Sequence, residues 1–310
     1  MSYAERFNET HKINFKDAAR LAADHNDSKL RATVMEQECE GERSAPVLYY
    51  DSGKAQRREG RAPGNRDAPA NRRRRWLKYQ PTFDSGEYID SNDKFQGMTD
   101  FQSPLMKHHY GNVRRFLDQN VILEGIFGES YEGEIGGTTI GFPSSRLIQA
   151  NVQKGSGTGV VGMNLEKIKA SRKAIAAGKH DLDAEDIWLL VTAEQIDDLS
   201  NELELTSADY RAEAGPQFSR DGKLSKVWNH MLLEYQDLPT KLDGDGNLVQ
   251  RNPAYLKSVM MLGVWKDIEE AAYPDSSKHN ELYMEVFANM DCRRLDESGV
   301  NEIESLLVAA

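Results

Sequence analysis

Residues 54–75, KAQRREGRAPGNRDAPANRRRR, form a long stretch with almost no apolar side chain. Glycine and proline punctuate it, and a segment of this composition cannot bury enough surface to fold by itself. The runs on either side, VLYYDSG and WLKYQPTFDSGEYID, have the β-rich composition of strands. We therefore expect residues 43–95 to form a long hairpin whose basic tip has no core of its own to lie on.

Charge is distributed unevenly along the chain. The 310 residues carry a formal net charge of -11, yet residues 54–78 contain ten basic and two acidic side chains. This segment therefore carries +8, and the rest of the chain carries -19. A basic element on an acidic body is attracted either to nucleic acid or to the acidic body of another copy.

Three interpretations of the basic segment remain open: a solvated loop, a nucleic-acid contact and a contact with another subunit. The acidic body would repel a polyanion, and no nucleic-acid recognition motif surrounds the arginines. Of the two functional interpretations we therefore favour the subunit contact. The candidate contact residues are Arg57, Arg58, Arg61, Arg66, Arg72, Arg73, Arg74, Arg75 and Trp76.

The rest of the chain has the pattern of an α+β fold. The longest helix is expected over residues 103–127, with Ser103 as N-cap, Pro104 at the first helical position and Gly128 at its end. A second helix, NLEKIKASRKAIAAG, is expected over residues 164–178. With 39% hydrophobic residues, the chain can build a substantial core and divide it between two domains or subdomains.

Strands are expected around and after the second helix. DIWLLVT at residues 186–192 is typical of a buried strand, and Thr192 with Gln195 forms the capping box of a following helix. VMMLGVW at residues 259–265 also has the pattern of a buried strand. The C-terminal segment, LYMEVFANMDCRRLDESGVNEIESLL, predicts two strands around a turn.

Two short motifs resemble ligand-binding loops. GTGVVG at residues 157–162 matches G-x-G-x-x-G, but NVQKGS before it is no hydrophobic strand, and the later strand ends at Thr192 without an acidic residue. LDGDGNLV at residues 242–249 resembles a calcium loop, but Leu248 stands where glycine is required and Ala254 where a bidentate glutamate is required. We expect a glycine linker and a tight turn, respectively.

No group of residues in the sequence indicates a catalytic, cofactor-binding or metal site. Cys39 and Cys292 are too few and too distant for a disulfide framework, so both thiols are expected to be free. His108 and His109 are adjacent and cannot share a metal as an i, i+4 pair on a helix would, so we expect surface or interface residues. No apolar run approaches the about 18 residues that span a bilayer, so we expect a soluble protein without a membrane partner.

The order of segments resembles the major capsid protein of tailed bacteriophages, a fold shared with encapsulins and the herpesvirus capsid floor. The stretches that carry the resemblance are RRRRWLKYQPTFDSGEYIDSND, VRRFLDQNVILEGIFGESYEG, NLEKIKASRKAIAAG, DIWLLVTAEQIDDL and VFANMDCRRLDESGVNEIE, between residues 70 and 310. The resemblance implies an N-terminal arm (1–42), an extended loop (43–95), a peripheral domain with a long spine helix (96–163 and 286–310) and an axial domain (164–285).

The resemblance also implies a function. The chain would self-assemble into the pentamers and hexamers of an icosahedral shell that encloses double-stranded DNA, without enzymatic activity or cofactor. Its partners would be further copies of itself, a portal protein, separate scaffolding and decoration proteins, and DNA bound without sequence specificity. It would be found in the virion after assembly in the host bacterial cytoplasm. The alternatives are an encapsulin-type compartment shell and a nucleotide-dependent enzyme that uses GTGVVG.

Overall fold

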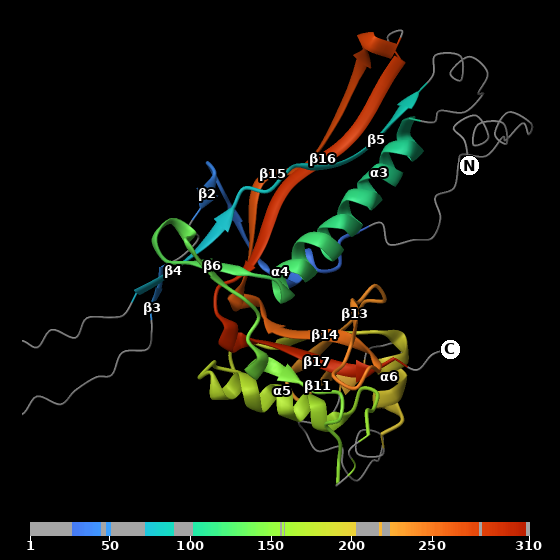
Figure 1. The fold of residues 1–310 in the computed structure, drawn as a ribbon. Coiled ribbons are helices and arrows are strands. Elements are labelled where there is room, and N and C mark those ends of the chain that lie inside the picture. Colours follow the sequence, from blue (N-terminus) through green and yellow to red (C-terminus); the bar gives the residue numbers. More distant parts are fainter. Residues whose placement is uncertain are drawn as a thin grey trace, which may run out of the picture.

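The computed structural model describes residues 27–44, 48–50, 72–89, 102–155, 157, 159–202, 217–218, 224–278 and 281–307. Two parts stand one above the other in Figure 1. A wide sheet with two helices forms a compact body, and a narrow sheet backed by a long helix extends from it as an arm. Within the described residues, no helix is long and apolar enough to cross a lipid bilayer.

The body is built on an eight-stranded sheet. Its order is β10-β11-β12-β9-β14-β17-β8, and β13 pairs with β14 outside this path. The strands are β8 (Leu147–Ile148), β9 (Ile187–Val191), β10 (Gln217–Phe218), β11 (Leu224–Val227), β12 (His230–Glu234), β13 (Thr240–Leu242), β14 (Leu248–Leu256) and β17 (Val300–Leu306). The central strand β9 is buried along almost its whole length, which explains the apolar run that predicted it.

Two helices of the body begin where the sequence predicts. Helix α5 (Leu165–Ala177) starts after Asn164, whose side chain accepts a hydrogen bond from the Lys167 backbone N–H at 2.9 Å. Helix α6 (Ala193–Ser200) starts with the reciprocal capping box of Thr192 and Gln195. Both predictions, and that of the strand between the helices, are confirmed.

The arm is a four-stranded sheet in the order β1-β15-β16-β5. Its strands are β1 (Met35–Glu38), β5 (Phe83–Ile89), β15 (Met260–Asp275) and β16 (Glu281–Arg294). The last two form a long antiparallel hairpin, and β15 has register shifts between Val264 and Glu269. VMMLGVW leads into β15, and the predicted C-terminal pair of strands is confirmed as β16 and β17.

A long helical rod packs along the arm (Figure 1). It consists of α3 (Gln102–Phe116), a π-helical segment (Leu117–Ile122) and α4 (Leu123–Phe127), which follow one another without a break. At Gly125 a Cβ atom would lie 2.2 Å from the Cys292 carbonyl oxygen, so only glycine permits this close approach of α4 to β16. The helix predicted over residues 103–127 is confirmed, although α3 already begins at Gln102, so that Ser103 is not its N-cap, and the π segment was not foreseen.

A small sheet lies where body and arm meet. Its order is β2-β4-β6-β7, and β3 also pairs with β4. The strands are β2 (Arg43–Ser44), β3 (Leu48–Tyr50), β4 (Arg72–Lys78), β6 (Ser130–Glu132) and β7 (Thr138–Ile140). Because residues 48–50 pair antiparallel with residues 72–74, the base of the predicted hairpin is present.

The structure differs from the sequence analysis at three places. Strand β5 pairs with β16 and not with the outgoing strands, so the segment predicted as the return of the hairpin divides between two sheets. The β-rich run LRATVMEQ predicts extended chain through Ala32 and Val34, but residues 31–33 form a 3-10 turn. The boundary expected between residues 285 and 286 falls inside β16, because register with β15 and β5 holds that strand together. The sequence also predicts a modest amphipathic helix at FKDAARLAADH, residues 15–25, which lie outside the described part of the chain.

Short 3-10 turns complete the fold. They are η1 (Arg31–Thr33), η3 (Glu134–Gly136), η4 (Ser144–Arg146), η6 (Lys257–Val259), η7 (Ser276–Lys278) and η8 (Glu297–Gly299). The turn η7 closes the distal end of the β15–β16 hairpin, whereas η6 and η8 lie where the arm strands join the body strands. One apolar core runs through this junction, from Leu117 and Ile126 of the rod to Leu189 and Val300 of the body sheet.

Candidate functional site

Strand β4 carries the four consecutive arginines and pairs antiparallel with β2, β3 and β6. Side chains alternate across a strand, and Arg75 and Leu77 are buried while Arg74 is exposed and Trp76 half-buried. The arginine run therefore has two faces with different roles. Arg72 and Arg73 are placed by their backbone pairing with residues 49 and 50.

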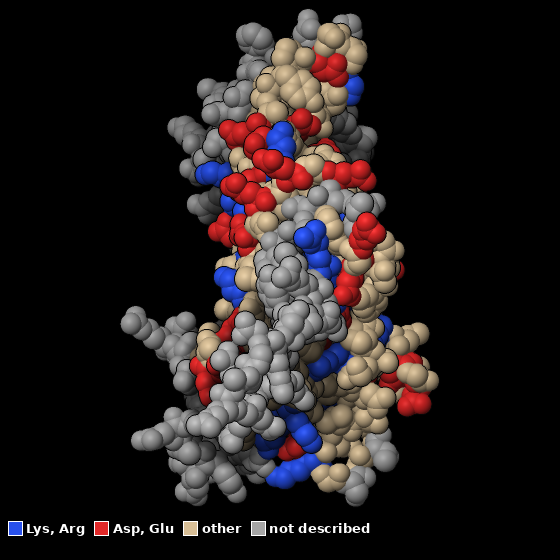
Figure 2. All heavy atoms as spheres, turned by 90° about the vertical axis from the view of Figure 1, so that its left-hand side faces the viewer, with Lys and Arg blue, Asp and Glu red and all other residues tan. Residues whose placement is uncertain are grey.

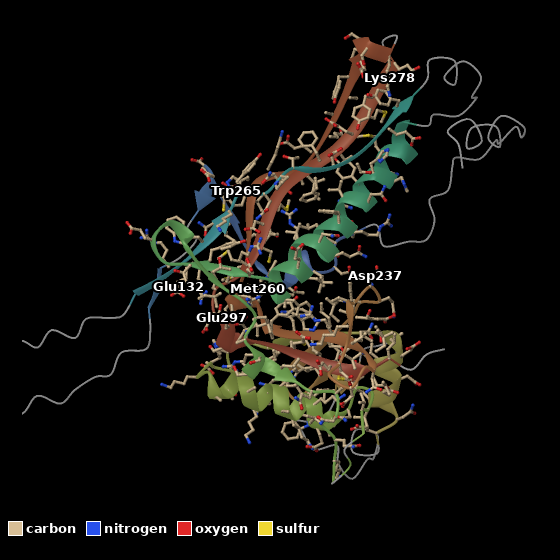
Figure 3. The ribbon with its side chains drawn as sticks, viewed as in Figure 1. Glu132, Asp237, Met260, Trp265, Lys278 and Glu297 are labelled. Carbon is tan, nitrogen blue, oxygen red and sulfur yellow. The ribbon has the colours of Figure 1, made fainter. Side chains whose placement is uncertain are left out.

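Arg75 points into the chain. Its Nη2 atom lies 2.6 Å from a Glu297 carboxylate oxygen and 3.7 Å from one of Glu132, and the side chain of Arg75 is 4% exposed. Figure 3 shows both carboxylates at the junction of arm and body. A buried guanidinium paired in this way fixes strand β4 to β6 and η8. We therefore interpret Arg75 as the anchor of the loop base.

The opposite face of β4 presents cations and aromatic rings. The Arg74 guanidinium lies 5.6 Å from the centroid of the Trp76 ring. The indole N–H of Trp76 donates to the Gly133 carbonyl oxygen at 2.8 Å, which fixes the ring. In the same row, the Lys78 ammonium lies 3.2 Å from the Tyr131 ring centroid. This face leaves the Arg74 charge open to solvent at the base of the loop.

The other candidate arginines, Arg57, Arg58, Arg61 and Arg66, lie outside the described residues. They belong to the segment between β3 and β4. In Figure 1 the ends of β3 and β4 that carry this segment point away from the body.

A second arginine pair beside β4 was not singled out from the sequence. Arg294 is fully buried, and its Nη1 atom donates to the Ile126 carbonyl oxygen at 2.5 Å. Burial lowers the pKa of Arg294 to about 10. Arg293 pairs with Asp291 at 2.8 Å, and burial raises the pKa of that carboxyl in spite of this partner. In the sequence, the only indication of these buried arginines is that two of them stand together shortly after the apolar run VFANM.

The arm carries the opposite charge. Its exposed carboxylates come from β1 and the residues after it, from β5 and from β15: Glu36, Glu38, Glu40, Asp84, Asp267, Glu269 and Glu270. We call this set the acidic arm face. Figure 2 shows acidic side chains predominating over the upper part of the molecule. A basic segment and an acidic surface are thus present in one chain, as the charge distribution predicted.

The glycine motif leads into a helix whose start is already occupied. The backbone N–H of Leu165 donates to both Glu202 carboxylate oxygens, at 3.1 and 3.2 Å. The Lys167 ammonium donates to the carbonyl oxygens of Val161 and Gly162 at 2.7 and 2.8 Å. A carboxylate therefore lies where a dinucleotide phosphate would bind. The expected linker before a capped helix is confirmed.

The second loop motif is a turn between β13 and β14. One Asp243 carboxylate oxygen accepts hydrogen bonds from the backbone N–H groups of Asp245 and Asn247, at 2.9 and 2.8 Å. Gly246 has a φ of +85°, which glycine adopts without strain. The tight turn is confirmed. The described residues contain no group of three or more His, Cys, Asp or Glu side chains that could hold a metal.

The two cysteines are free and buried, as expected. The two histidines differ from each other. His108 is exposed, but His109 is 5% exposed, and its Nδ1 atom lies 2.9 Å from the Ser85 hydroxyl of β5. The surface or interface position expected for His109 is wrong, because that face of α3 packs on the sheet of its own arm.

Comparison with known proteins matches the fold. Among solved structures, the capsid of cyanophage P-SCSP1u has a TM-score of 0.66 and 12% identity, with 96% of this chain and 93% of that chain covered. The cyanophage Pam1 capsid has a TM-score of 0.67 and 10% identity, with 96% of each chain covered. The Ralstonia phage GP4 capsid has a TM-score of 0.66 and 12% identity, also with 96% of each covered. At such identities the likeness concerns the fold.

The sequence itself gives the family. No curated protein sequence matches the chain. The phage capsid protein family, however, matches residues 7–306, which is nearly the whole chain. The expected α+β capsid fold and the expected family are both confirmed: the chain belongs to the phage capsid protein family.

Proposed function

We propose that this chain is the major capsid protein of a tailed bacteriophage. In this proposal it assembles into the pentamers and hexamers of an icosahedral shell that encloses double-stranded DNA. The observation that carries the proposal is the family match over residues 7–306. The capsid folds of the similar structures support it, since each covers more than nine tenths of the chain.

The charge distribution supplies the contact between subunits. The basic loop, with Arg57, Arg58, Arg61 and Arg66 at its tip and Arg74 and Trp76 at its base, binds the acidic arm face of a neighbour. Each contact is modest, because exposed charge pairs contribute about 0–1 kcal/mol apiece. A closed shell repeats the contact in every subunit, and each subunit is held by several neighbours at once.

The remaining partners follow from the same proposal. The shell includes a portal protein, uses separate scaffolding and decoration proteins, and holds DNA without reading its sequence. A net charge of -11 limits adhesion of the subunit to the packaged polyanion. The protein then assembles in the host cytoplasm and encloses the DNA in the virion, and it catalyses no reaction.

Negative-stain microscopy of the overexpressed chain tests the proposal. We expect shells, tubes or curved sheets, and monodisperse single chains at high concentration would contradict it. Particles collected from a phage-producing cell should hold nuclease-resistant double-stranded DNA. Particles filled with an enzyme would instead indicate an encapsulin. A nucleotide-dependent enzyme is disfavoured by the Glu202 carboxylate at the start of α5.

A further inference from the structure

Two guanidinium groups are buried where the arm, the body and the small sheet meet. Arg75 of β4 is buried, and Arg294 near the end of β16 is fully buried. The Nη2 atom of Arg75 lies 2.6 Å from a Glu297 carboxylate oxygen. Arg294 precedes Glu297 closely in the chain, and its charge interacts with those of Glu297 and Arg75. These three side chains therefore form one polar cluster.

Most hydrogen-bond donors of this cluster have no acceptor among the described residues. Arg294 donates only from Nη1, to the carbonyl oxygens of Gly125 and Ile126, and its Nε and Nη2 atoms are buried without a partner. Arg75 donates only from Nη2, and its Nε and Nη1 atoms are buried in the same condition. A buried donor without an acceptor destabilises the fold, so these nitrogens require a further partner.

The cluster also contains oxygen atoms without a donor. The second carboxylate oxygen of Glu297, Oε1, is buried and receives no hydrogen bond from a described residue. The buried hydroxyl of Ser130 in β6 has no partner among these residues either. Side chains alternate along a strand, so Ser130 lies on the same face of β6 as Glu132, which is 3.7 Å from Arg75 Nη2. The hydroxyl is therefore on the side of β6 that faces Arg75.

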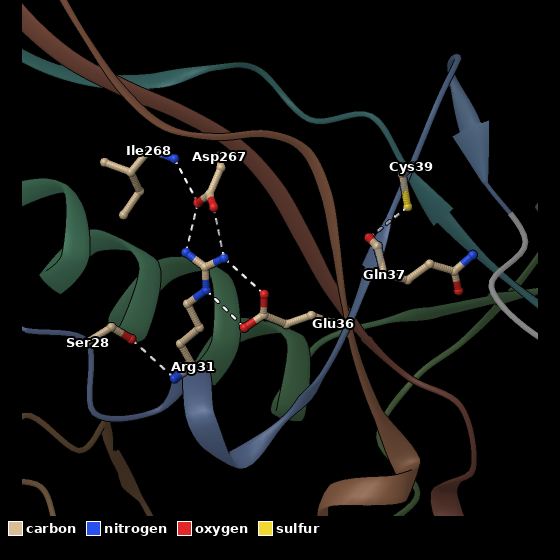
Figure 4. A network of polar contacts seen from close by, with 7 residues as sticks. All are labelled: Ser28, Arg31, Glu36, Gln37, Cys39, Asp267 and Ile268. Carbon is tan, nitrogen blue, oxygen red and sulfur yellow. Dashed lines mark hydrogen bonds and ion pairs between the residues drawn. The ribbon is translucent and has the colours of Figure 1, made fainter.

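An arginine nearer the surface shows how a guanidinium is satisfied in this chain. The side chain of Arg31 is 26% exposed, yet all three of its nitrogens donate. Nε and Nη2 donate to Glu36, both at 2.9 Å, and Nη1 and Nη2 donate to Asp267 at 2.8 and 3.2 Å (Figure 4). Arg75 and Arg294 are farther from bulk solvent but have fewer partners. Ordered internal water generally satisfies buried polar groups that protein atoms do not reach.

The kinds of unpartnered atoms select the ligand. The guanidinium nitrogens require an acceptor, whereas Glu297 Oε1 requires a donor. An anion such as chloride accepts but cannot donate, and the carboxylate would repel it, while the two guanidinium groups would repel a metal cation. Water accepts and donates two hydrogen bonds each, so it can join Arg75 and Arg294 to Glu297. The four unpartnered nitrogens exceed the lone pairs of one molecule, so more than one is needed.

We propose that the junction of arm, body and small sheet is a binding site for a cluster of ordered water molecules, which accept hydrogen bonds from Arg75 and Arg294 and donate to Glu297 Oε1 and Ser130. We call it the junction water site. Strands β4, β6 and β16 and the turn η8 each contribute one of these side chains. The water therefore links parts of the chain that are distant in sequence. The proposal concerns the single chain and does not depend on whether shells form.

A density map of the chain, from shells or from crystals, tests the proposal at a resolution that shows ordered water. We expect peaks at hydrogen-bond distance, roughly 2.7–3.2 Å, from the unpartnered nitrogens of Arg75 and Arg294 and from Glu297 Oε1. Peaks that contact the guanidinium nitrogens but not Glu297 would indicate a bound anion. Direct pairing of the side chains without any peak would also overturn the proposal.

Replacing chloride with gluconate at constant ionic strength separates water from an anion. We expect the unassembled chain to have the same melting temperature in both salts, because water needs no particular anion. A higher melting temperature in chloride would identify an anion site and overturn the water site.

A serine substitution gives a test by sign. If water bonds the Ser130 hydroxyl, Ser130→Ala should lower the melting temperature by about 2 °C. A hydroxyl without any partner would instead give an unchanged or higher value, since the methyl group removes an unsatisfied polar atom. Ser145→Ala, at an exposed serine, is the matched control and should cause no change. An unchanged or higher melting temperature for Ser130→Ala would overturn the proposal.

Discussion

The buried network of the body sheet and the exposed charged surface of the arm place polar side chains in two different environments. In the body, Gln195 bonds through Nε2 to Ser305 at 2.6 Å and to Gln250 at 2.9 Å, and all three residues are buried. In the arm, the comparable polar contact joins Lys266 and Glu269, whose side chains are 46% and 55% exposed. A buried, satisfied network specifies one packing of a self-sufficient core. Exposed charge pairs of the kind seen on the arm contribute little to the stability of the single chain.

The junction between the two regions should give the largest effect on the stability of the single chain. Replacing Arg75 with alanine removes a buried guanidinium and leaves the Glu297 carboxylate, whose side chain is 18% exposed, without its cation, so we expect the free energy of unfolding to fall by about 3 kcal/mol. Arg74→Ala, one residue away on the exposed face, should change it by about 0.5 kcal/mol or less. Urea denaturation of both variants measures the difference. Equal losses would show that β4 does not have two distinct faces.

A buried histidine should make the body sensitive to acid. His230 lies between the Trp228 carbonyl oxygen and the Ser171 hydroxyl, with Arg172 nearby, and burial lowers its pKa to about 4. The folded pKa is below the ordinary value of about 6.5, so this contribution to stability is complete above pH 6.5 and is lost as pH falls toward 4. Between pH 7 and pH 5 we expect a loss of about 2 kcal/mol.

Urea melts of the wild type and of His230→Asn at both pH values check this expectation. The variant has no group that titrates at this position, so its loss between pH 7 and pH 5 should be smaller by about 2 kcal/mol. The same pH dependence in both proteins would remove His230 as the cause.

The helix cap of α6 should have a smaller effect. Thr192→Ala removes the acceptor of the Gln195 backbone N–H, and we expect the free energy of unfolding to fall by about 1 kcal/mol. Thr192→Ser keeps the hydroxyl and serves as the control, with little change expected. A thermal melt followed by circular dichroism compares the two. A serine variant as unstable as the alanine variant would assign the effect to the lost methyl group.

The smallest effect is expected in the arm. The Arg31 guanidinium holds the pKa of Asp267 below its ordinary value, so the pair stabilises the fold above that value and loses its effect as pH falls through the folded pKa. The Asp267 side chain is 57% exposed, and Asp267→Asn should cost about 1 kcal/mol or less and nothing measurable at 1 M salt. Urea denaturation at low and high salt checks this. A cost greater than that of Arg75→Ala would reverse the contrast between junction and arm.

Local chemistry made much of the fold predictable. Asn164, Thr192 and Gln195 satisfy backbone groups next to them in sequence, so their helices could be located from a few residues. The pairing of β5 with β16 joins residues about 200 positions apart, and no local pattern encodes it. The same limit applies to the buried position of His109, which depends on Ser85 from a distant strand.

The charge of the candidate site could be predicted from the sequence, but the direction in which each arginine side chain points could not. The +8 of residues 54–78 against the -19 of the remaining chain predicted a basic element and an acidic partner surface. Four identical arginines gave no sign that Arg75 turns inward while Arg74 turns outward, because this depends on the register of β4 with β6. The approach of Glu38 to Trp265 was also missed, since it arises only through the parallel pairing of β1 with β15.

Sedimentation velocity of the purified chain tests the central claim most directly. The wild type is compared with a variant in which Arg57, Arg58, Arg61 and Arg66 are replaced by serine, at low and at high salt. Our account predicts that the wild type sediments as shells at low salt, that high salt weakens them, and that the folded variant sediments as single chains or small oligomers. Shells of the variant as abundant as those of the wild type at both salt concentrations would contradict it.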